Sequence, residues 1–409
     1  MSSPTVLIIG CGVAGPVIGI FLKRKGYSPI IFEKAQTPGD VGASLSIWPN
    51  GMHVLEKIGM AAKVQGVGSP LTRICEMKSS GEVLGQVPLC ELFKERYGQP
   101  AHGIRRVLFT SMLREAAVQE GIAVRVGWTL ESVREDGNSV TAMFSGGREE
   151  TGAFLVGCDG MKGVSRKSFP GKYHPKSLRD IFVDMGQTAC FSPTPSFIKE
   201  GESMCTWNGD GMHALCYPIS EGLTSWVVTQ GGDEESKGSW GIYDAATRAR
   251  AKAALLELLK DWDSRLLDFA MSAGRIIRYG IYDRPALDSS QWFSKRCILI
   301  GDAAHPTSVH IGQGANMAME DCYLLNKHLP SVTPDTTGLR TEQLQKAFKA
   351  MAEVQQPRTA ALVKAARAQG DARVAKGSEA LKRNDEISRR YADPNLYMAR
   401  LDFMYNRPD

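Results

Sequence analysis

The side chains best able to carry chemistry stand in residues 299–321, LIGDAAHPTSVHIGQGANMAMED. An apolar run ends at Gly-Asp, and two histidines, His305 and His310, follow Asp302 and lie five positions apart. Because an imidazole has a near-neutral pKa, such a ring is suited to give a proton to a substrate or take one from it. A metal site is not expected, since these three side chains lack a further ligand nearby and their spacing fits no standard zinc set.

Glycines later in the same segment favour a flat ligand. Gly312 and Gly314 would let backbone come close to a planar group, and Ala315 and Asn316 begin a predicted helix. A helix N-terminus attracts negative charge, and a reduced flavin carries its negative charge around N1 and C2=O. The segment therefore suits the edge of a flavin ring.

A second set of glycines, Gly10-Cys11-Gly12-Val13-Ala14-Gly15, forms a G-x-G-x-x-G motif. Gly10 permits a tight turn, Gly12 lets backbone approach a pyrophosphate, and Gly15 lets helix and strand pack closely. Glu33 stands 23 positions after Gly10, where a carboxylate accepts from ribose hydroxyls and would repel a 2′-phosphate. We expect FAD or NAD, not NADP, at this motif; the alternative is a glycine-rich turn without a ligand.

A parallel sheet must position these motifs. Residues 5–9 are a short β-branched run, predicted as a buried strand, and a helix over 14–25 and a strand over 27–32 complete a βαβ unit. Two more buried strands, over 153–158 and 297–300, stop at an Asp-Gly and a Gly-Asp pair. Asp302 therefore falls at the carboxyl edge where α/β sheets bind ligands, whereas the pair at Asp159 is by itself typical of a strand-ending turn.

The middle of the chain has a different residue pattern, one typical of antiparallel strands. Asn-Gly and Asp-Gly at 208–211 predict a hairpin between 203–207 and 212–218, and residues 225–230 continue the antiparallel pattern. Helices are predicted over 105–120, over 244–260 and, as surface helices, within the charged, alanine-rich residues 341–390. The predicted fold class is α/β: a Rossmann-like unit with an inserted antiparallel β-sheet domain and C-terminal helices.

The three glycine and aspartate signals, in this order and with these gaps, resemble those of the group A flavoprotein monooxygenases, the p-hydroxybenzoate hydroxylase-like family. The resemblance covers most of residues 1–330 and continues in Gly42-Ala43, Pro49-Asn50 and Tyr217-Pro218. Arg106 matches the family arginine that contacts FAD, and Arg166 fits the basic residue that closes the family's DGxxSxvR pattern.

The resemblance implies noncovalently bound FAD, with NADPH or NADH as a transient reductant and O2 as cosubstrate. In such a cycle O2 adds at flavin C4a, and the hydroperoxide delivers one oxygen atom to an aromatic or otherwise electron-rich small molecule, while the protein orients and shields the cofactor. The expected cofactor-binding residues are Gly10, Gly12, Val13, Ala14, Gly15, Glu33, Lys34, Ala43, Arg106, Asp159, Asp302, Gly312, Gly314, Ala315 and Asn316.

The resemblance also suggests the domain organisation. We expect a discontinuous FAD-binding domain over 1–70, 103–172 and 290–330, a substrate domain over 71–102 and 173–289, and a C-terminal helical region over 331–409. Two positions depart from the family: Gly163 stands where serine is usual, and Val309 replaces a proline that lies beside the flavin near the substrate. The second departure puts the usual phenol-hydroxylase pocket in question, and leaves FAD binding untouched.

Three residues are predicted as catalytic. His310 follows Val309 at the expected flavin–substrate junction; the alternative is a loop histidine that faces solvent or the flavin edge. His305, in contrast, is expected to have a structural role and to bond backbone in the turn after Asp302. His213 and Tyr217 share one strand face with Leu215 by the period of two, and that face would meet the flavin. Trp207 and Trp226 are expected in the core; Arg179, Arg275, Arg278 and Arg284 are conceivable carboxylate clamps.

The composition of the chain limits which partners and which cellular setting are expected. Charged residues make up 23% of the 409, the net charge is only +5 and no dense basic block occurs, so nucleic acid is not an expected partner. The nine scattered cysteines fit a reducing, cytoplasmic setting, and no run is long enough for a membrane span. We expect a monomer or homodimer. A flavin-dependent epoxidase, an oxidase or reductase without oxygen transfer, a halogenase and a non-enzymatic flavin-binding protein remain the alternatives.

Overall fold

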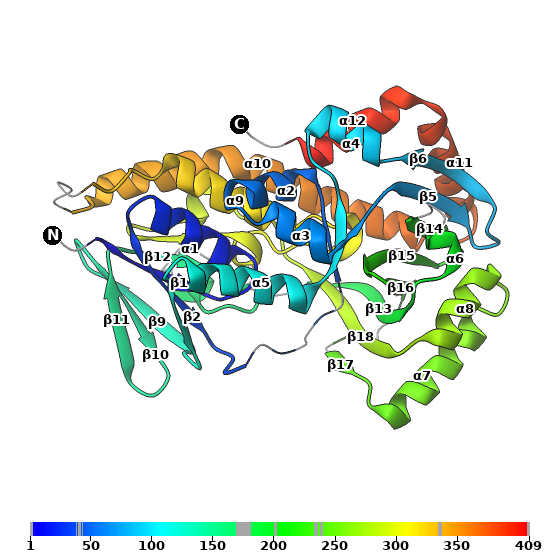
Figure 1. Cartoon of the computed structure of the whole chain (residues 1–409), viewed down its shortest axis with the longest axis horizontal. Coiled ribbons are helices and arrows are strands. Elements are labelled where there is room, and N and C mark those ends of the chain that lie inside the picture. The colour runs from blue at the N-terminus through cyan, green and yellow to red at the C-terminus, as the bar shows by residue number, and fades with distance from the viewer. Residues whose placement is uncertain are drawn as a thin grey trace.

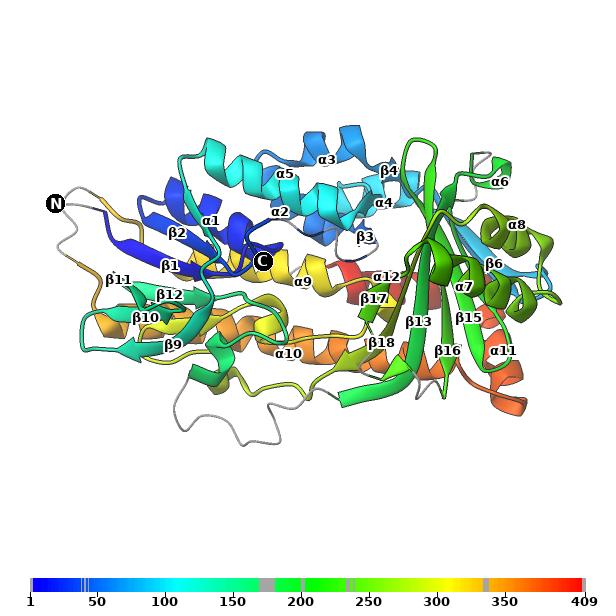
Figure 2. The same cartoon turned by 90° about the horizontal axis from the view of Figure 1, so that it is seen from below.

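The computed structural model describes residues 3–37, 39, 42, 44–168, 181–199, 203–232, 236–237, 240–333 and 338–406. Two sheets stand side by side along the long axis, and the helix α10 (Thr341–Arg373) runs past both of them (Figure 2). In the described part of the chain, no helix is both long and apolar enough to cross a membrane.

The first sheet is parallel and has the order β19-β12-β1-β2-β8. Its central strand β1 (Thr5–Ile9) consists almost wholly of apolar residues, and Val6, Leu7 and Ile8 are fully buried because helices and other strands cover both faces. The predicted strands and helices around it are confirmed, with each end shifted by at most one residue. They are α1 (Ala14–Arg24), β2 (Ser28–Glu33), α5 (Arg106–Gln119), β12 (Phe154–Gly157) and β19 (Cys297–Leu299); β8 (Ala123–Val126) closes the edge.

The second sheet has eight strands in the order β17-β18-β13-β16-β15-β14-β5-β6. It is antiparallel except for the parallel pair β14 and β5. The predicted hairpin is confirmed as β14 (Met204–Asn208) and β15 (Met212–Ser220), followed by β16 (Leu223–Gly231). The other strands are β5 (Arg73–Lys78), β6 (Val83–Pro88), β13 (Ile181–Pro193), β17 (Trp240–Ile242) and β18 (Arg275–Asp283).

Alternation along these strands divides the sheet into two faces. The helices α7 (Ala245–Leu258) and α8 (Ser264–Ser272) cover the outer face, where Met212, Ala214 and Cys216 of β15 pack with Trp207 and Trp226 (Figure 1). The two tryptophans are therefore core residues, as expected. The other face of β15 carries His213, Leu215 and Tyr217, and it turns toward the parallel-sheet unit.

Smaller elements lie between and around the two sheets. A three-stranded sheet of β3 (Ser44–Ile47), β7 (His102–Arg105) and β4 (Ser69–Pro70) separates them, and a second one outside the parallel sheet consists of β9 (Leu130–Glu135), β10 (Val140–Phe144) and β11 (Arg148–Gly152). The remaining helices of this part are α2 (Pro49–Lys57), α3 (Ala61–Val67), α4 (Cys90–Tyr97), α6 (Ser196–Lys199) and α9 (Gly314–His328). Short 3-10 turns, η1 (Ser165–Ser168), η4 (Ser289–Gln291), η5 (Gly301–Ala303) and η6 (Val309–Ile311), connect them.

The C-terminal part forms α10, α11 (Ser378–Ala392) and α12 (Pro394–Tyr405). The prediction that residues 341–390 form surface helices is wrong for one face of α10. Leu344, Phe348 and Met351 are fully buried in the core of the parallel-sheet unit, and Leu362 and Ala366 pack in the cluster beside the large sheet. Because α10 contacts both units along its length, it connects them.

Candidate functional site

The glycine motif forms the turn between β1 and α1. Gly10 has φ +107°, and a Cβ there would lie 2.5 Å from the Cys158 carbonyl oxygen, while a Cβ on Gly15 would lie 2.0 Å from the Gly10 carbonyl oxygen. Both glycines are thus required by the protein itself. A Cβ on Gly12 would meet no protein atom within 4 Å, and Gly12 is exposed. A ligand lying against Gly12 would explain a glycine there, and a pyrophosphate on the uncapped N-terminus of α1 is such a ligand.

Glu33, at the end of β2, is held against this turn. Its Oε2 accepts from the Cys11 backbone N–H at 2.9 Å, and its Oε1 accepts from the Ala35 N–H at 2.9 Å. Burial, together with the Glu33 carboxylate, raises the pKa of the Cys11 thiol to about 11, so the thiol stays protonated at neutral pH. Val13 is half-buried and Ala14 buried, Lys34 is exposed after Glu33, and Ala43 lies outside the described residues.

Asp159 follows β12 and faces the same edge of the sheet. Its Oδ2 accepts from the Ser165 N–H at 2.9 Å, and burial raises the pKa of its carboxyl group. A Cβ on Gly163 would lie 2.1 Å from the Asp159 Cγ. The departure from the family's serine therefore has a local reason, since the carboxylate of Asp159 occupies the space of a side chain.

Asp302 lies in η5, directly after β19. Its side chain is exposed, yet desolvation by the surrounding protein raises its pKa, opposed by the charges of Arg106 and His305. Exposure together with desolvation indicates a group in a recess. The structure thus brings Arg106 of α5 and Asp302 of η5 within electrostatic reach of each other, and Arg106 also lies against Gly42, whose Cβ would be 3.0 Å from the Arg106 Cδ.

His305 braces this turn through a partner different from the predicted one. Its Nε2 lies 2.6 Å from the Asp321 Oδ2, which also accepts from the Gly301 N–H at 2.7 Å. Burial alone would lower the pKa of His305, but the Asp321 carboxylate outweighs burial and raises it. The expectation of a bond from this ring to backbone is therefore wrong; a carboxylate from α9 links the ring to the backbone of the turn.

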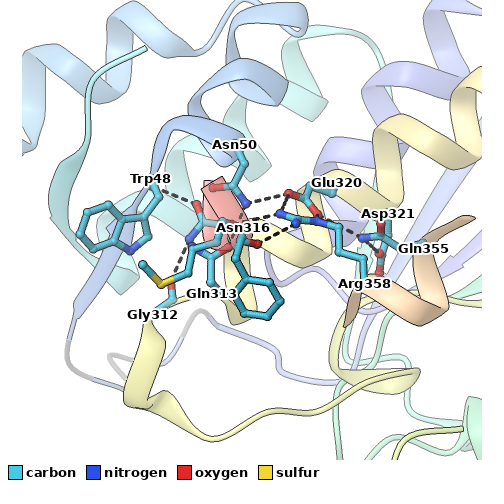
Figure 3. Close-up of polar contacts among 11 residues, drawn as sticks. Trp48, Asn50, Gly312, Gln313, Asn316, Glu320, Asp321, Gln355 and Arg358 are labelled. Carbon is cyan, nitrogen blue, oxygen red and sulfur yellow. Dashed lines mark hydrogen bonds and ion pairs between the residues drawn. The ribbon is translucent and has the colours of Figure 1, made fainter. Parts of the chain in front are cut away.

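The turn before α9 is held by Asn316. Its Oδ1 accepts from the Trp48 N–H at 3.0 Å, and its Nδ2 donates to the Ser46 and Gly312 carbonyl oxygens at 3.1 and 2.9 Å. Gly312 has φ +63°, and a Cβ there would lie 2.6 Å from the Ser46 Oγ. The buried Asn316 side chain therefore positions the Gly312 turn (Figure 3), and Gly314 and Ala315 present the backbone N-terminus of α9.

A buried polar network extends from this turn into the C-terminal helices (Figure 3). Asn50 Nδ2 donates to the Gln313 Oε1 at 2.9 Å and to the Glu320 Oε1 at 2.7 Å. Arg358 of α10 forms two bonds to Glu320, at 2.9 and 2.8 Å, and donates to the backbone carbonyls of Phe403 and Met404 in α12. Gln355 Nε2 donates to Glu320 Oε2 and to Asp321 Oδ1.

Sequence reasoning missed this network. Gln355 and Arg358 stand in a charged, alanine-rich segment whose pattern is that of a solvated helix. Glu320 lies in the buried face of α9 with 2% of its side chain exposed, so its carboxylate needs the guanidinium as a partner.

The inner face of the large sheet presents three rows of side chains that cross four strands. The registers pair His213 with Thr229, Thr229 with Gln187, and Gln187 with Tyr279, which makes a polar row. Gln187 Nε2 donates to the Thr229 Oγ1 at 2.8 Å, and the Tyr279 hydroxyl donates to the Gln187 Oε1. The next row is apolar and consists of Leu215, Val227, Ala189 and Ile277; the third consists of Tyr217, Ser225, Phe191 and Arg275.

The third row joins the sheet to the parallel-sheet unit. The Ser44 Oγ of β3 lies 2.7 Å from the Tyr217 hydroxyl and donates to the Ser225 Oγ at 2.7 Å. A Cβ on Gly103 would lie 2.1 Å from the Pro218 carbonyl oxygen, so β7 packs directly on β15. Burial raises the pKa of Tyr217 to about 12, which keeps its hydroxyl protonated.

The two predicted catalytic histidines come together. The rings of His213 and His310 are 5.8 Å apart, and both are buried. Burial, followed by the charge of Arg373, lowers the pKa of His310 to about 3 and that of His213 well below its usual range. Both rings are therefore neutral at physiological pH. A Cβ on Gly370 of α10 would lie 2.4 Å from the His310 Cδ2, so His310 packs on α10, while Val309 is 47% exposed.

Of the four arginines considered as carboxylate clamps, Arg275 lies in the third row of the sheet, with its guanidinium 5.7 Å from the Phe191 ring centre. Arg284 is buried, Arg278 is half-buried, and Arg179 lies outside the described residues. No group of three or more His, Cys, Asp or Glu side chains suited to a metal ion occurs within the described ranges.

Comparison with known proteins identifies the family. A family model described as an FAD-binding domain matches residues 3–352, most of the chain. The chain belongs to this family, the group A flavin monooxygenases. This flavin monooxygenase is 28% identical to a 3-hydroxybenzoate 6-hydroxylase of Polaromonas naphthalenivorans over 93% of this chain and 90% of that one. It is 27% identical to a 6-hydroxynicotinate 3-monooxygenase of Pseudomonas fluorescens over 81% of this chain and 83% of that one.

Solved structures confirm the fold. Klebsiella pneumoniae HpxO, complexed with FAD and uric acid, superposes on this flavin monooxygenase with a TM-score of 0.84, 22% identity, and coverage of 99% of this chain and 97% of that one. A salicylate hydroxylase substrate complex gives a TM-score of 0.77 at 16% identity and covers 100% of this chain and 96% of that one. The predicted fold class, family and enzyme class are thereby confirmed.

Proposed function

We propose that this flavin monooxygenase binds FAD at the β1–α1 turn and at the Gly312 turn, takes electrons from NADPH or NADH, and inserts one oxygen atom from O2 into a small aromatic molecule. The observation that carries the aromatic substrate is the apolar row of Leu215, Val227, Ala189 and Ile277, which has the polar row on one side and the mixed third row on the other. Four strands at about 4.8 Å spacing make this row about 14 Å long, and the two flanking rows lie about 7 Å to either side. A flat ring with polar substituents fits such a surface.

The residues that would hold FAD follow from the geometry. Backbone N–H groups at Gly12 and the start of α1 would bind the pyrophosphate, and Glu33 the adenosine ribose. Asp302 and Arg106 would contact the ribityl chain and the ring system. The Gly312 turn, with the Gly314 and Ala315 backbone, would face the pyrimidine edge, while Asn316 holds that turn from inside. When bound, FAD supplies the redox chemistry that activates O2.

The three predicted catalytic residues take different roles in this proposal. Tyr217 stays protonated and holds the sheet to β3, so its hydroxyl orients the substrate rather than moving a proton. His213 lies in the polar row beside the apolar row, where its neutral ring can bond a substrate substituent. His310, buried against α10 with a pKa of about 3, is a weak base and supports the pocket wall.

Relatives support this class of substrate. Similar proteins include enzymes named for hydroxylation of 3-hydroxybenzoate and monooxygenation of 6-hydroxynicotinate. The exposed Val309, at the position of the family's proline, would give the flavin-side wall an apolar surface. The proposed domain bounds are those of the sequence prediction, and we further propose a cytoplasmic protein that is a monomer or homodimer.

The test is to purify the protein, record the absorbance of bound FAD, and follow NADPH and NADH oxidation with a panel of hydroxybenzoates, phenols and hydroxypyridines under labelled O2. We expect substrate-stimulated oxidation and a product heavier by one labelled oxygen atom. Oxidation of the nicotinamide without a labelled product would favour an oxidase or reductase instead. Protein that takes up no FAD would refute the proposal.

A further inference from the structure

The ring of His305 belongs to a closed loop of hydrogen bonds beneath the turn that carries Asp302. Its Nε2 lies 2.6 Å from the Asp321 Oδ2, and that oxygen also accepts from the Gly301 N–H at 2.7 Å. Gly301 has φ +59°, and its carbonyl oxygen accepts from the His305 backbone N–H at 2.9 Å. A carboxylate of α9 and an imidazole of the turn therefore fix the backbone from which the Asp302 side chain projects.

Asp321 needs a cation as its partner. None of its side chain is exposed, and its two further hydrogen bonds within the described chain come from a backbone N–H and from the neutral Gln355 side chain. The guanidinium group of Arg358, which approaches from the same helix as Gln355, is bound by Glu320. A buried carboxylate without a cation is strongly unfavourable. Burial lowers the pKa of His305, but the charge of Asp321 outweighs burial and raises it, so the ring supplies that cation.

An indole ring covers the imidazole of His305. The Trp292 side chain is buried, and its ring centre lies 5.2 Å from that of His305, with an angle of 33° between the two planes. The face of an aromatic ring attracts a cation at this separation. The indole and the carboxylate together favour the imidazolium form of His305 against the cost of burying a charge.

The charge of His305 acts on the cofactor side of the turn through Asp302. The Asp302 side chain is exposed; among the described groups, Arg106 of α5 and His305 favour its ionised form, and Asp321 opposes it. With His305 protonated, two cations balance two carboxylates. With His305 neutral, one guanidinium group faces both carboxylates, and FAD would add the negative charge of its phosphates.

We propose that His305 is a positioning residue for FAD: as a buried imidazolium ion it offsets Asp321, and it thereby keeps Asp302 ionised and placed to accept from the ribityl hydroxyls. The inference rests on the proposed function. His305 and Asp321 need not contact FAD, since both act through Asp302, whose side chain is exposed. Because the pKa of His305 is raised, its charge is complete below the usual 6.5 and is lost as the pH rises through the raised value. FAD affinity should fall over that same interval.

The first measurement is the protonation state of His305 in the FAD-free protein. Histidine is isotope-labelled, and the ring resonances are followed by NMR from about pH 5 to about pH 9. The resonances of His305 are those missing from the double variant His305→Gln/Asp321→Asn, which contains no unpaired charge and is therefore expected to fold. We expect the His305 ring to be cationic at pH 7.

The second measurement is FAD affinity, followed by the quenching of flavin fluorescence. At pH 7 we expect His305→Gln to bind FAD about tenfold more weakly, the equivalent of one pKa unit of interaction with Asp302. Adding Asp321→Asn should recover most of that affinity, because an amide needs no cation. His102→Gln is the matched control: this histidine of β7 is also buried, but burial lowers its pKa to about 4, so it is neutral at pH 7 and its replacement leaves the pH dependence of FAD affinity unchanged.

Three results would overturn the inference. They are a His305 ring that is neutral at pH 7, wild-type FAD affinity in His305→Gln, and a double variant that binds FAD no better than His305→Gln. A role limited to hydrogen bonding would give the last result, since the double variant does not restore the imidazole. The NMR measurement needs no cofactor, so a protein that takes up no FAD would refute the proposed function while the charge of His305 is still measured.

Discussion

Replacing Arg358 by Met tests whether the C-terminal helices hold the flavin turn. The change removes both bonds to Glu320, at 2.9 and 2.8 Å, and leaves a carboxylate of which only 2% is exposed without its cation. Breaking a buried ion pair by removing one partner destabilises a protein by about 3–5 kcal/mol. Since 15% of the Arg358 side chain is exposed, we expect the lower part of that range, about 3 kcal/mol.

The effect should also reach FAD. Asn50 shares its amide between Glu320 and Gln313, so a displaced Glu320 loosens the residue that begins the N-terminal turn of α9. We expect FAD to bind about tenfold more weakly, as measured by the release of flavin fluorescence. Thermal unfolding of the FAD-free protein measures the stability, with a midpoint lowered by about 5 °C or more.

Two further variants make this prediction refutable. Glu320→Gln added to Arg358→Met removes the unpaired charge and should restore part of the lost stability, about 1–2 kcal/mol. Arg367→Met is the control, because Arg367 lies on the same helix as Arg358 but pairs with Asp283 of β18, outside the Glu320 network. The reasoning fails if Arg358→Met and Arg367→Met weaken FAD binding equally, or if the double variant is no more stable than Arg358→Met.

Three other predictions concern the two proposed ligand regions. Gly370→Ala should destabilise the protein by about 1–3 kcal/mol in denaturant unfolding, because its Cβ would lie 2.4 Å from the His310 Cδ2, although alanine favours helices. His310→Ala should relieve this clash. Strictly additive effects of the two substitutions on the free energy of unfolding would contradict the prediction. The pKa of His310 is lowered from its usual 6.5 to about 3, so as the pH falls this histidine is protonated in the unfolded chain before it is protonated in the folded protein. The free energy of unfolding therefore has its full contribution from the neutral His310 above pH 6.5, and about 2 kcal/mol of it is lost between pH 7 and pH 5. His310→Gln should lessen that acid sensitivity, and an unchanged pH profile of unfolding would refute the assignment. Gly12→Ala should leave the thermal stability of the FAD-free protein unchanged, since no protein atom lies within 4 Å of the added Cβ. The same substitution should weaken FAD binding at least about tenfold. A variant that binds FAD with wild-type affinity would remove Gly12 from the site.

The sequence by itself determined the parallel-sheet unit and the likeness to flavin monooxygenases. These depend on local signals: a β-branched strand, three glycines in the following turn, an acid at the end of the next strand, and a Gly-Asp pair after another strand. Each signal reflects a backbone requirement within a few residues, such as the positive φ of Gly10 and Gly312, so it can be found without knowing the rest of the fold. The period of two likewise predicted that His213 and Tyr217 share one face of β15.

Only the tertiary structure decided which polar side chains of the C-terminal helices contact the residues around the site. Arg358 and Arg373 lie in a helix whose charged pattern is the same whether its side chains meet water or a buried carboxylate. Their partners, Glu320 and His310, are 38 and 63 positions away in the chain. The apolar row likewise takes one residue from each of four strands, and only the register of those strands aligns them. Such contacts arise when distant segments pack together, and a sequence pattern read over one segment carries no record of them.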